Sequence, residues 1–210
     1  MIRILCYGDS NTYGFDPTRP DARYPEEILW TTLLAKRLGE EYEILNFGLN
    51  GRTTAYDRPD KEGKNGLLGL RPALETALPC DWLVIMLGTN DCSRSLGLSP
   101  QEITDGLEVL ILAAKKHLRD LGAKLPHLLL IAPAPILPEL AGTPFEDDLD
   151  ETSVESSRAL APLYRELAES YGALFLDAAG CEVSPLDCEH LTEAGHRELA
   201  ERICALLREN

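Results

Sequence analysis

Five short runs of apolar residues, separated by longer segments, most strongly limit how this chain can fold. The runs are continuous rather than alternating with polar residues, which is typical of strands buried on both faces of a parallel sheet. They cover residues 2–7, 42–47, 82–87, 128–132 and 174–176. Parallel strands need crossover connections, usually helices, on the faces of the sheet. The pattern therefore predicts an α/β fold whose five-stranded parallel sheet carries helices on both sides.

The clearest predicted helix lies between the third and fourth runs. Apolar residues recur there at steps of three and four from Ile103 to Leu121 and form a single stripe. Ser99 precedes this stripe and Glu102 follows three residues later, which is the pattern of a capping box. Gly122 comes directly after the last periodic residue and is expected to end the helix.

The rest of the chain is predicted to form further helices and three long loops within one domain, residues 1–210. Similar apolar stripes predict helices over residues 30–38, 160–171 and 199–207. Pro162 is expected to start or kink the second of these helices. Long loops, typical of lids and binding loops, are expected over residues 15–27, 52–66 and 136–151.

Charge and composition exclude several classes of protein. The chain has 35 acidic and 20 basic residues and a formal net charge of −15, so its surface should repel nucleic acid. No apolar run reaches the ~18 residues that a membrane-spanning helix needs. The apolar stretch at the N-terminus is too short for a secretory signal, so we expect a cytoplasmic protein. Its six cysteines contain no C-x-x-C pair and are expected to be free thiols.

Small and polar residues follow the first three predicted strands, over residues 8–10 (GDS), 48–51 (GLNG) and 88–91 (GTND). In an open α/β sheet, ligands bind at the carboxyl ends of the strands, where these segments should meet. The chain contains neither of the glycine-rich motifs that bind the phosphates of nucleotides. These segments therefore predict a functional site of another kind.

Near the other end of the chain, Asp187 lies three residues before His190, ahead of the last helix. At this spacing the carboxylate can accept a hydrogen bond from one ring nitrogen while the other nitrogen faces a hydroxyl. Taken alone, such a pair is more often two polar residues on the protein surface than a catalytic pair. A metal site formed by His190 and His196 is a less favoured alternative, because no H-E-x-x-H motif occurs and His196 is expected near exposed helical turns.

Taken in chain order, these segments resemble the sequence blocks of the SGNH hydrolases, also called the GDSL esterases. The matching blocks are residues 8–10, the region of Gly51, residues 88–91 and residues 187–190. The resemblance implies the family's flavodoxin-like fold, a three-layer α/β/α sandwich around the five-stranded parallel sheet. It implies no metal and no cofactor.

One branch of that family, the oligomeric arylesterases and acyltransferases, is the most similar. Residues 48–54 (GLNGRTT) and 85–91 (IMLGTND) carry this likeness, together with the long loops. Two positions depart from the family pattern. Asn11 stands where the family has Leu, and Cys188 stands where Gly is common. We expect these departures to affect packing and loop shape rather than the catalytic residues.

The resemblance implies a role for each site residue. Ser10 would be the nucleophile, His190 the general base, and Asp187 the group that fixes the tautomer of the histidine. The oxyanion would be bound by the N–H groups of Ser10 and Gly51 and by the side-chain amide of Asn90. The structural alternatives are a helix cap at Ser10, a left-handed turn at Gly51 and a turn former at Asn90.

The predicted function is that of a serine esterase acting on small soluble aryl or acetyl esters through an acyl-enzyme, with acyl transfer to alcohols as a further expectation. A carbohydrate acetylesterase is the alternative enzyme, since the same fold and triad would serve it equally well. A non-catalytic scaffold is the alternative from another class. The presence of Ser10, Asp187 and His190 together argues against a scaffold, which needs none of them.

The expected partners are a small ester substrate and further copies of the chain, with no nucleic acid and no membrane. A homo-oligomer is expected because the long loop over residues 136–151 carries four apolar residues that another subunit could bury. These are Ile136, Leu137, Leu140 and Phe145. Three aromatic residues could line the substrate pocket or pack in the core, namely Tyr13, Phe15 and Trp30.

Overall fold

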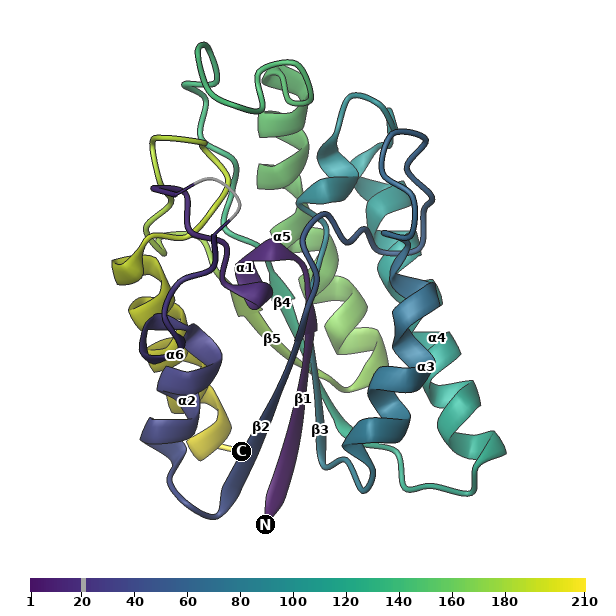
Figure 1. Cartoon of the computed structure of the whole chain (residues 1–210). Helices are drawn as coiled ribbons and strands as arrows, with labels where there is room; N and C mark the ends of the chain where they lie inside the picture. The colour runs from purple at the N-terminus through teal and green to yellow at the C-terminus, as the bar shows by residue number, and fades with distance from the viewer. Residues whose placement is uncertain (20–21) are drawn as a thin grey trace.

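The computed structural model describes residues 1–19 and 22–210. In this part of the chain, five parallel strands form one sheet in the order β2-β1-β3-β4-β5 (Figure 1). The strands are β1 (Ile2–Gly8), β2 (Tyr42–Gly48), β3 (Trp82–Met86), β4 (His127–Ala132) and β5 (Leu174–Asp177). All five coincide with the predicted runs to within one residue at each end.

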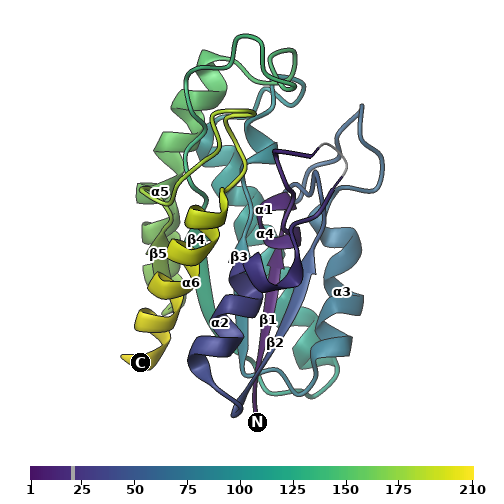
Figure 2. The ribbon, with the colours of Figure 1, turned by 60° about the vertical axis from the view of Figure 1, so that its left-hand side comes forward.

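The sheet lies between two layers of helices. The helices are α1 (Ser10–Tyr13), α2 (Trp30–Leu38), α3 (Gly66–Ala77), α4 (Pro100–Asp120), α5 (Glu151–Tyr171) and α6 (Glu193–Arg208). Helices α2 and α6 cover one face of the sheet, and α3, α4 and α5 cover the other (Figures 1 and 2). The predicted three-layer α/β/α sandwich is confirmed.

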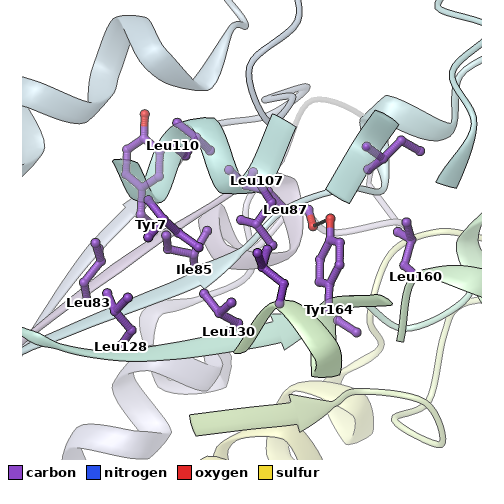
Figure 3. Close-up of a cluster of buried hydrophobic side chains, with 14 of the residues drawn as sticks. Tyr7, Leu83, Ile85, Leu87, Leu107, Leu110, Leu128, Leu130, Leu160 and Tyr164 are labelled. Carbon is purple, nitrogen blue, oxygen red and sulfur yellow. Dashed lines mark hydrogen bonds between the residues drawn. The ribbon is translucent and has the colours of Figure 1, made fainter. Parts of the chain in front are cut away.

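Both faces of the sheet are buried, which explains the continuous apolar runs. Along β3, Leu83 and Ile85 point into the core beneath α3, α4 and α5. Val84 and Met86, which alternate with them, point into the core beneath α2 and α6. Figure 3 shows the first of these cores, where the side chain of Tyr164 from α5 lies beside Leu87. Apolar side chains therefore predominate on both faces of the central strands.

The helix ends follow the sequence signals where those signals are complete. The Ser99 hydroxyl accepts a hydrogen bond from the Glu102 N–H, and the Glu102 carboxylate accepts one from the Ser99 N–H. The predicted capping box at the start of α4 is therefore confirmed. Gly122 has a φ of +65°, the left-handed conformation with which helices commonly end.

Two helices differ from the prediction. Helix α5 begins at Glu151, nine residues before the predicted start at residue 160, and Pro162 lies in its interior. Asp150 caps this helix by accepting a hydrogen bond from the Ser153 N–H. Helix α3 was not predicted at all, although Leu70 and Leu74 supply a short apolar stripe. Pro72 lies inside α3 and Pro162 lies inside α5. Because proline usually ends or begins a helix, the sequence did not predict α3 or the first turns of α5.

The predicted long loops border the carboxyl edge of the sheet. The loop over residues 52–66 ends where α3 begins, and the loop over 136–151 ends where α5 begins. The predicted loop over 15–27 contains residues 20–21, which lie outside the described residues. All six cysteines are free, as the sequence predicted, and all six are buried. No helix among the described residues is long and apolar enough to cross a membrane.

Candidate active site

The position of Ser10 is set by the sharp turn from β1 into α1. Asp9 caps α1 by accepting a hydrogen bond from the Asn11 N–H at 2.9 Å, so that Ser10 becomes the first helical residue. Helix α1 packs against the end of β2 at Gly48. A Cβ atom there would lie 2.0 Å from the backbone nitrogen of Tyr13. Glycine at this position allows the close approach that holds the serine at the edge of the sheet.

The structure joins Ser10, His190 and Asp187 in one chain of hydrogen bonds. His190 Nε2 lies 2.8 Å from Ser10 Oγ, and His190 Nδ1 lies 2.8 Å from Asp187 Oδ2. The other oxygen of Asp187 accepts the backbone N–H of His190 at 3.1 Å, which fixes the carboxylate in the turn. Because ionised Asp187 can only accept, the Nδ1 atom of a neutral His190 carries the proton and Nε2 can accept from the serine hydroxyl. All three side chains are buried.

The Asn11 side chain links the serine turn to the histidine loop. Its amide nitrogen donates to the Glu189 carbonyl at 3.1 Å, and its amide oxygen accepts from the Leu191 N–H at 2.8 Å. These two bonds bracket His190 on both sides. Asn11 therefore does more than pack a helix, and the prediction missed this contribution because the partners are about 180 residues away in sequence.

Cys188, the second departure from the family pattern, has a φ of +66°. A non-glycine residue rarely adopts this left-handed conformation. A glycine would suit this position because glycine adopts a positive φ without steric cost. The left-handed backbone of Cys188 agrees with the prediction that this residue affects the shape of the loop. Its side chain is fully buried, and its thiol donates to the Glu139 carbonyl.

Gly51 and Asn90 come from the turns after β2 and β3 and line one cavity with Ser10 and His190. The cavity has a volume of about 240 Å³. Gly51 has a φ of +78°, so the left-handed turn weighed as its structural alternative is present as well. Asn90 begins a 3₁₀ turn, Asn90–Cys92, and its buried side chain faces the same cavity. The structure thus brings together all five residues that the sequence singled out.

Asp91 holds the turn after β3 against the loop over residues 52–66. Its carboxylate accepts hydrogen bonds from the Thr54 N–H at 3.0 Å and from the Thr54 hydroxyl at 2.6 Å. Burial raises the pKa of Asp91 to about 6, although both bonds from Thr54 oppose this rise. The contact fixes the spacing between the two turns that carry Gly51 and Asn90.

Neighbouring charges raise the pKa of His190. Burial alone would lower it, but the nearby carboxylate of Glu189 and the hydrogen bond and charge of Asp187 outweigh this effect. Burial also raises the pKa of Glu189, against the opposing effect of His190. The site therefore contains a histidine that becomes protonated more readily than in water, flanked by two carboxylates.

Of the three aromatic residues considered for the pocket, only Phe15 lines it. Its ring centroid lies 4.3 Å from that of His190. Trp30 is fully buried in the core, where its indole N–H donates to the Asn11 carbonyl. Tyr13 stacks under Arg23 and is not among the residues that line the cavity.

Four further residues line the cavity that sequence reasoning did not identify. These are Lys61, Lys64, Phe145 and Glu189. The first three lie in the long loops over residues 52–66 and 136–151, for which the sequence predicted no role at the site; Phe145 was considered only as a residue that another subunit could bury. Buried Arg58 joins these two loops through the carboxylate of Asp148, at 2.9 Å. No periodic pattern in the sequence signals such a contact between loops.

The sequence analysis expected His196 near exposed helical turns, as one argument against a metal site with His190, and this expected position is wrong. His196 is buried because it packs between α6 and the start of α2, where its Nδ1 accepts the Trp30 N–H at 3.2 Å. Burial lowers its pKa to about 3, and the charge of His190 adds to this effect. Among residues 1–19 and 22–210, no group of three or more His, Cys, Asp or Glu side chains is arranged to hold a metal ion.

A hydroxyl, an imidazole and a carboxylate in series are the groups that acyl transfer from an ester uses. The fold and this site together define the class of protein, an ester hydrolase. The chain belongs to the GDSL-like lipase/acylhydrolase family, whose model matches residues 6–198.

Individual relatives agree with this assignment. The chain is 32% identical to Est24, a carbohydrate acetylesterase from Sinorhizobium meliloti, with a TM-score of 0.91 over 100% of this chain and 99% of that one. The M. smegmatis aryl esterase gives the same identity, coverage and TM-score. A probable rhamnogalacturonan acetylesterase of Bacillus subtilis (strain 168), YesY, is 23% identical and is matched over 98% of this chain and 88% of its own length.

Proposed function

We propose that this protein, acting as one catalytic domain over residues 1–210, hydrolyses small soluble esters with Ser10 as its nucleophile. The observation that carries the proposal is the hydrogen-bonded series from Ser10 through His190 to Asp187. His190 Nε2 accepts the proton of the Ser10 hydroxyl as its oxygen attacks the ester carbonyl. Asp187 holds the Nδ1 proton in place and stabilises the imidazolium that forms.

The tetrahedral intermediate carries a negative oxygen that needs donors in fixed positions. We assign these donors to the N–H groups of Ser10 and Gly51 and to the side-chain amide of Asn90. Their place around one cavity supports this assignment. His190 then returns its proton to the leaving alcohol. Water attacks the acyl-enzyme, with His190 again as base, and releases Ser10.

The substrate class follows from the size and lining of the cavity. A volume of about 240 Å³ fits a small acyl group such as acetyl, with the alcohol portion extending to the opening. Aryl and acetyl esters with a small acyl group both fit a cavity of this size. The names of the M. smegmatis aryl esterase and of Est24 support these two classes of substrate. An alcohol that replaces water in the second step would receive the acyl group, which is the predicted acyltransferase activity.

Sugar acetates are the second candidate substrates, in line with the carbohydrate acetylesterase that the sequence analysis gave as its alternative. Lys61, Lys64 and Glu189 give one part of the cavity a charged lining, which is suited to an alcohol with hydroxyl groups. The names of Est24 and YesY support this candidate.

The proposal is tested with p-nitrophenyl acetate and two serine variants. Ser10→Ala removes the nucleophile and should lower the rate of hydrolysis by at least 10³-fold. Ser170→Ala is the matched control, because its hydroxyl lies on the exposed end of α5 and contacts only the Leu167 carbonyl. Wild-type activity in a folded Ser10→Ala protein would contradict the proposal.

We also propose a homo-oligomer in the cytoplasm. Two of the residues behind the first expectation, Ile136 and Leu140, are buried within the chain itself, so the loop gives it less support than the sequence implied. Leu68 on α3 and Leu112 on α4 are 63% and 52% exposed, and they support an apolar contact surface instead. Light scattering at micromolar concentration is the test. A mass of 23.2 kDa would contradict the oligomer.

A further inference from the structure

Glu189 places a second carboxylate next to His190, beside the ring nitrogen that faces the serine. Its Oε1 atom lies 3.5 Å from His190 Nε2, and its side chain lines the cavity. The residue is only 9% exposed. Among residues 1–19 and 22–210, no N–H or O–H group is hydrogen-bonded to this carboxylate. Because the side chain lines the cavity, a ligand there can donate a hydrogen bond to the carboxylate, and a carboxylate at a largely buried site gains from such a donor.

The mechanism fixes which part of the substrate comes near Glu189. His190 Nε2 returns its proton to the oxygen of the leaving alcohol, so this oxygen must approach Nε2 closely. Glu189 Oε1 lies 3.5 Å from the same Nε2 atom, so the first carbons of the alcohol pass within reach of this carboxylate. A hydroxyl group on the second carbon of the alcohol would be within reach of the carboxylate.

We propose that Glu189 determines specificity for the alcohol by accepting a hydrogen bond from a hydroxyl group next to the ester oxygen. The preferred substrates are then acetyl esters of polyols, sugars included, over esters of simple alkyl alcohols. This inference rests on the proposed function, because it assumes that Ser10 and His190 carry out the hydrolysis.

A hydroxyl is the donor that fits better than an ammonium group. Lys61 and Lys64 line the same cavity, and the Lys61 ammonium is held 3.3 Å from the Asp148 carboxylate. Two positive charges at the opening oppose a cationic alcohol such as choline. Phe15 and Phe145 lie next to the His190 ring and line the same cavity, where they supply apolar surface against which the carbons of a polyol can pack.

The first test uses the wild-type enzyme and three acetates at pH 8. 2-Hydroxyethyl acetate carries the donor, n-propyl acetate replaces the hydroxyl by a methyl group, and 2-methoxyethyl acetate keeps the electron withdrawal without a donor. Each kcat/KM is divided by the rate constant for hydroxide-catalysed hydrolysis of the same ester. We expect the hydroxyethyl ester to be favoured about 10-fold or more over both others. Equal normalised values for the three esters would overturn the proposal.

Variants then show whether Glu189 is the acceptor. Glu189→Leu removes every acceptor and should bring the ratio of hydroxyethyl to propyl ester close to one. Glu189→Gln keeps one acceptor oxygen and should retain part of the preference. Glu139→Leu, which removes an exposed carboxylate outside the cavity, is the control and should keep the wild-type ratio.

The two proposals fail in different ways. A wild-type ratio in both folded Glu189 variants would overturn the role of Glu189, while the serine mechanism would stand. Hydrolysis of all three esters by folded Ser10→Ala would instead overturn the proposed function. If Glu189→Leu does not fold, Glu189→Gln and the wild-type comparison of the three esters still decide the question.

Discussion

The buried imidazole of His196 should make the fold sensitive to acid in a way that can be measured separately. His196 packs between α6 and the start of α2, with its ring edge-on to Tyr24 and its Nδ1 accepting the Trp30 N–H. Protonation would place a charge in this buried space and would remove the acceptor that Trp30 uses. A decrease from pH 8 to pH 5 tests this, because it crosses the pKa of 6.5 that this histidine has in the unfolded chain.

The size of the effect follows from the two pKa values of this histidine. The pKa is about 3 in the folded protein, whereas an unperturbed histidine, as in the unfolded chain, has a pKa of 6.5. Between these values the unfolded state binds the proton and the folded state does not, so stability is full above pH 6.5 and falls as the pH decreases towards 3. At pH 5 the free energy of unfolding should have decreased by about 2 kcal/mol through His196 alone.

The assay is urea unfolding of the wild type and of His196→Asn at pH 8 and pH 5. Asparagine can offer its Oδ1 to the Trp30 N–H but does not titrate. Other groups also change with pH; His190, whose pKa is raised, contributes stability that is lost as pH rises. Contributions from groups that do not interact with His196 are common to both proteins and cancel in the comparison. The pH-dependent loss should be about 2 kcal/mol smaller in the variant. An equal loss in the two proteins would show that His196 is not held neutral by burial.

Three further predictions concern the site. Asn90→Ala should lower kcat for p-nitrophenyl acetate by about 10²–10³-fold with a modest change in KM, and wild-type turnover would refute its role at the oxyanion. The acid limb of kcat/KM should have its midpoint above 6.5, because the pKa of His190 is raised and only the neutral ring acts as a base; a flat profile down to pH ~4.5 would refute this. Gly48→Ala should lower the free energy of unfolding, measured in urea, by about 1–3 kcal/mol and should also lower activity, because the new Cβ atom would lie 2.0 Å from the backbone nitrogen of Tyr13. An unchanged free energy of unfolding would refute this packing argument.

Much of the fold was predictable because strands that are buried on both faces of a sheet have continuous runs of apolar residues in the sequence. Positions on both faces of a central strand must be largely apolar, as Leu83 and Val84 illustrate by packing into opposite cores. The capping box at Ser99 is similarly local, and local patterns can be identified without knowledge of the rest of the fold. Helix α3 was missed because Pro72 interrupts a stripe that tertiary packing nevertheless holds in a helix.

At the site, too, the residues that belong to local sequence motifs were predicted, whereas the contacts between distant segments were not. Ser10, Asp187 and His190 were identified because their spacing and the family's sequence blocks are local features. The contacts of Asn11 with the histidine loop, and of Glu189 with the cavity, depend on segments that only the folded chain brings together. Loop residues also lack the periodicity that marks a buried face, so their side-chain directions could not be predicted.

The measurement that tests the central claim most directly is covalent labelling of Ser10 by a fluorophosphonate, read by intact mass and peptide mapping. A serine activated by His190 should take up one label per chain, on the peptide that contains Ser10. His190→Ala should be labelled far more slowly, because its serine lacks the base that lies 2.8 Å from Oγ in the wild type. Ser10→Ala should take up no label. A label on another residue, or equal labelling of folded Ser10→Ala, would contradict the account.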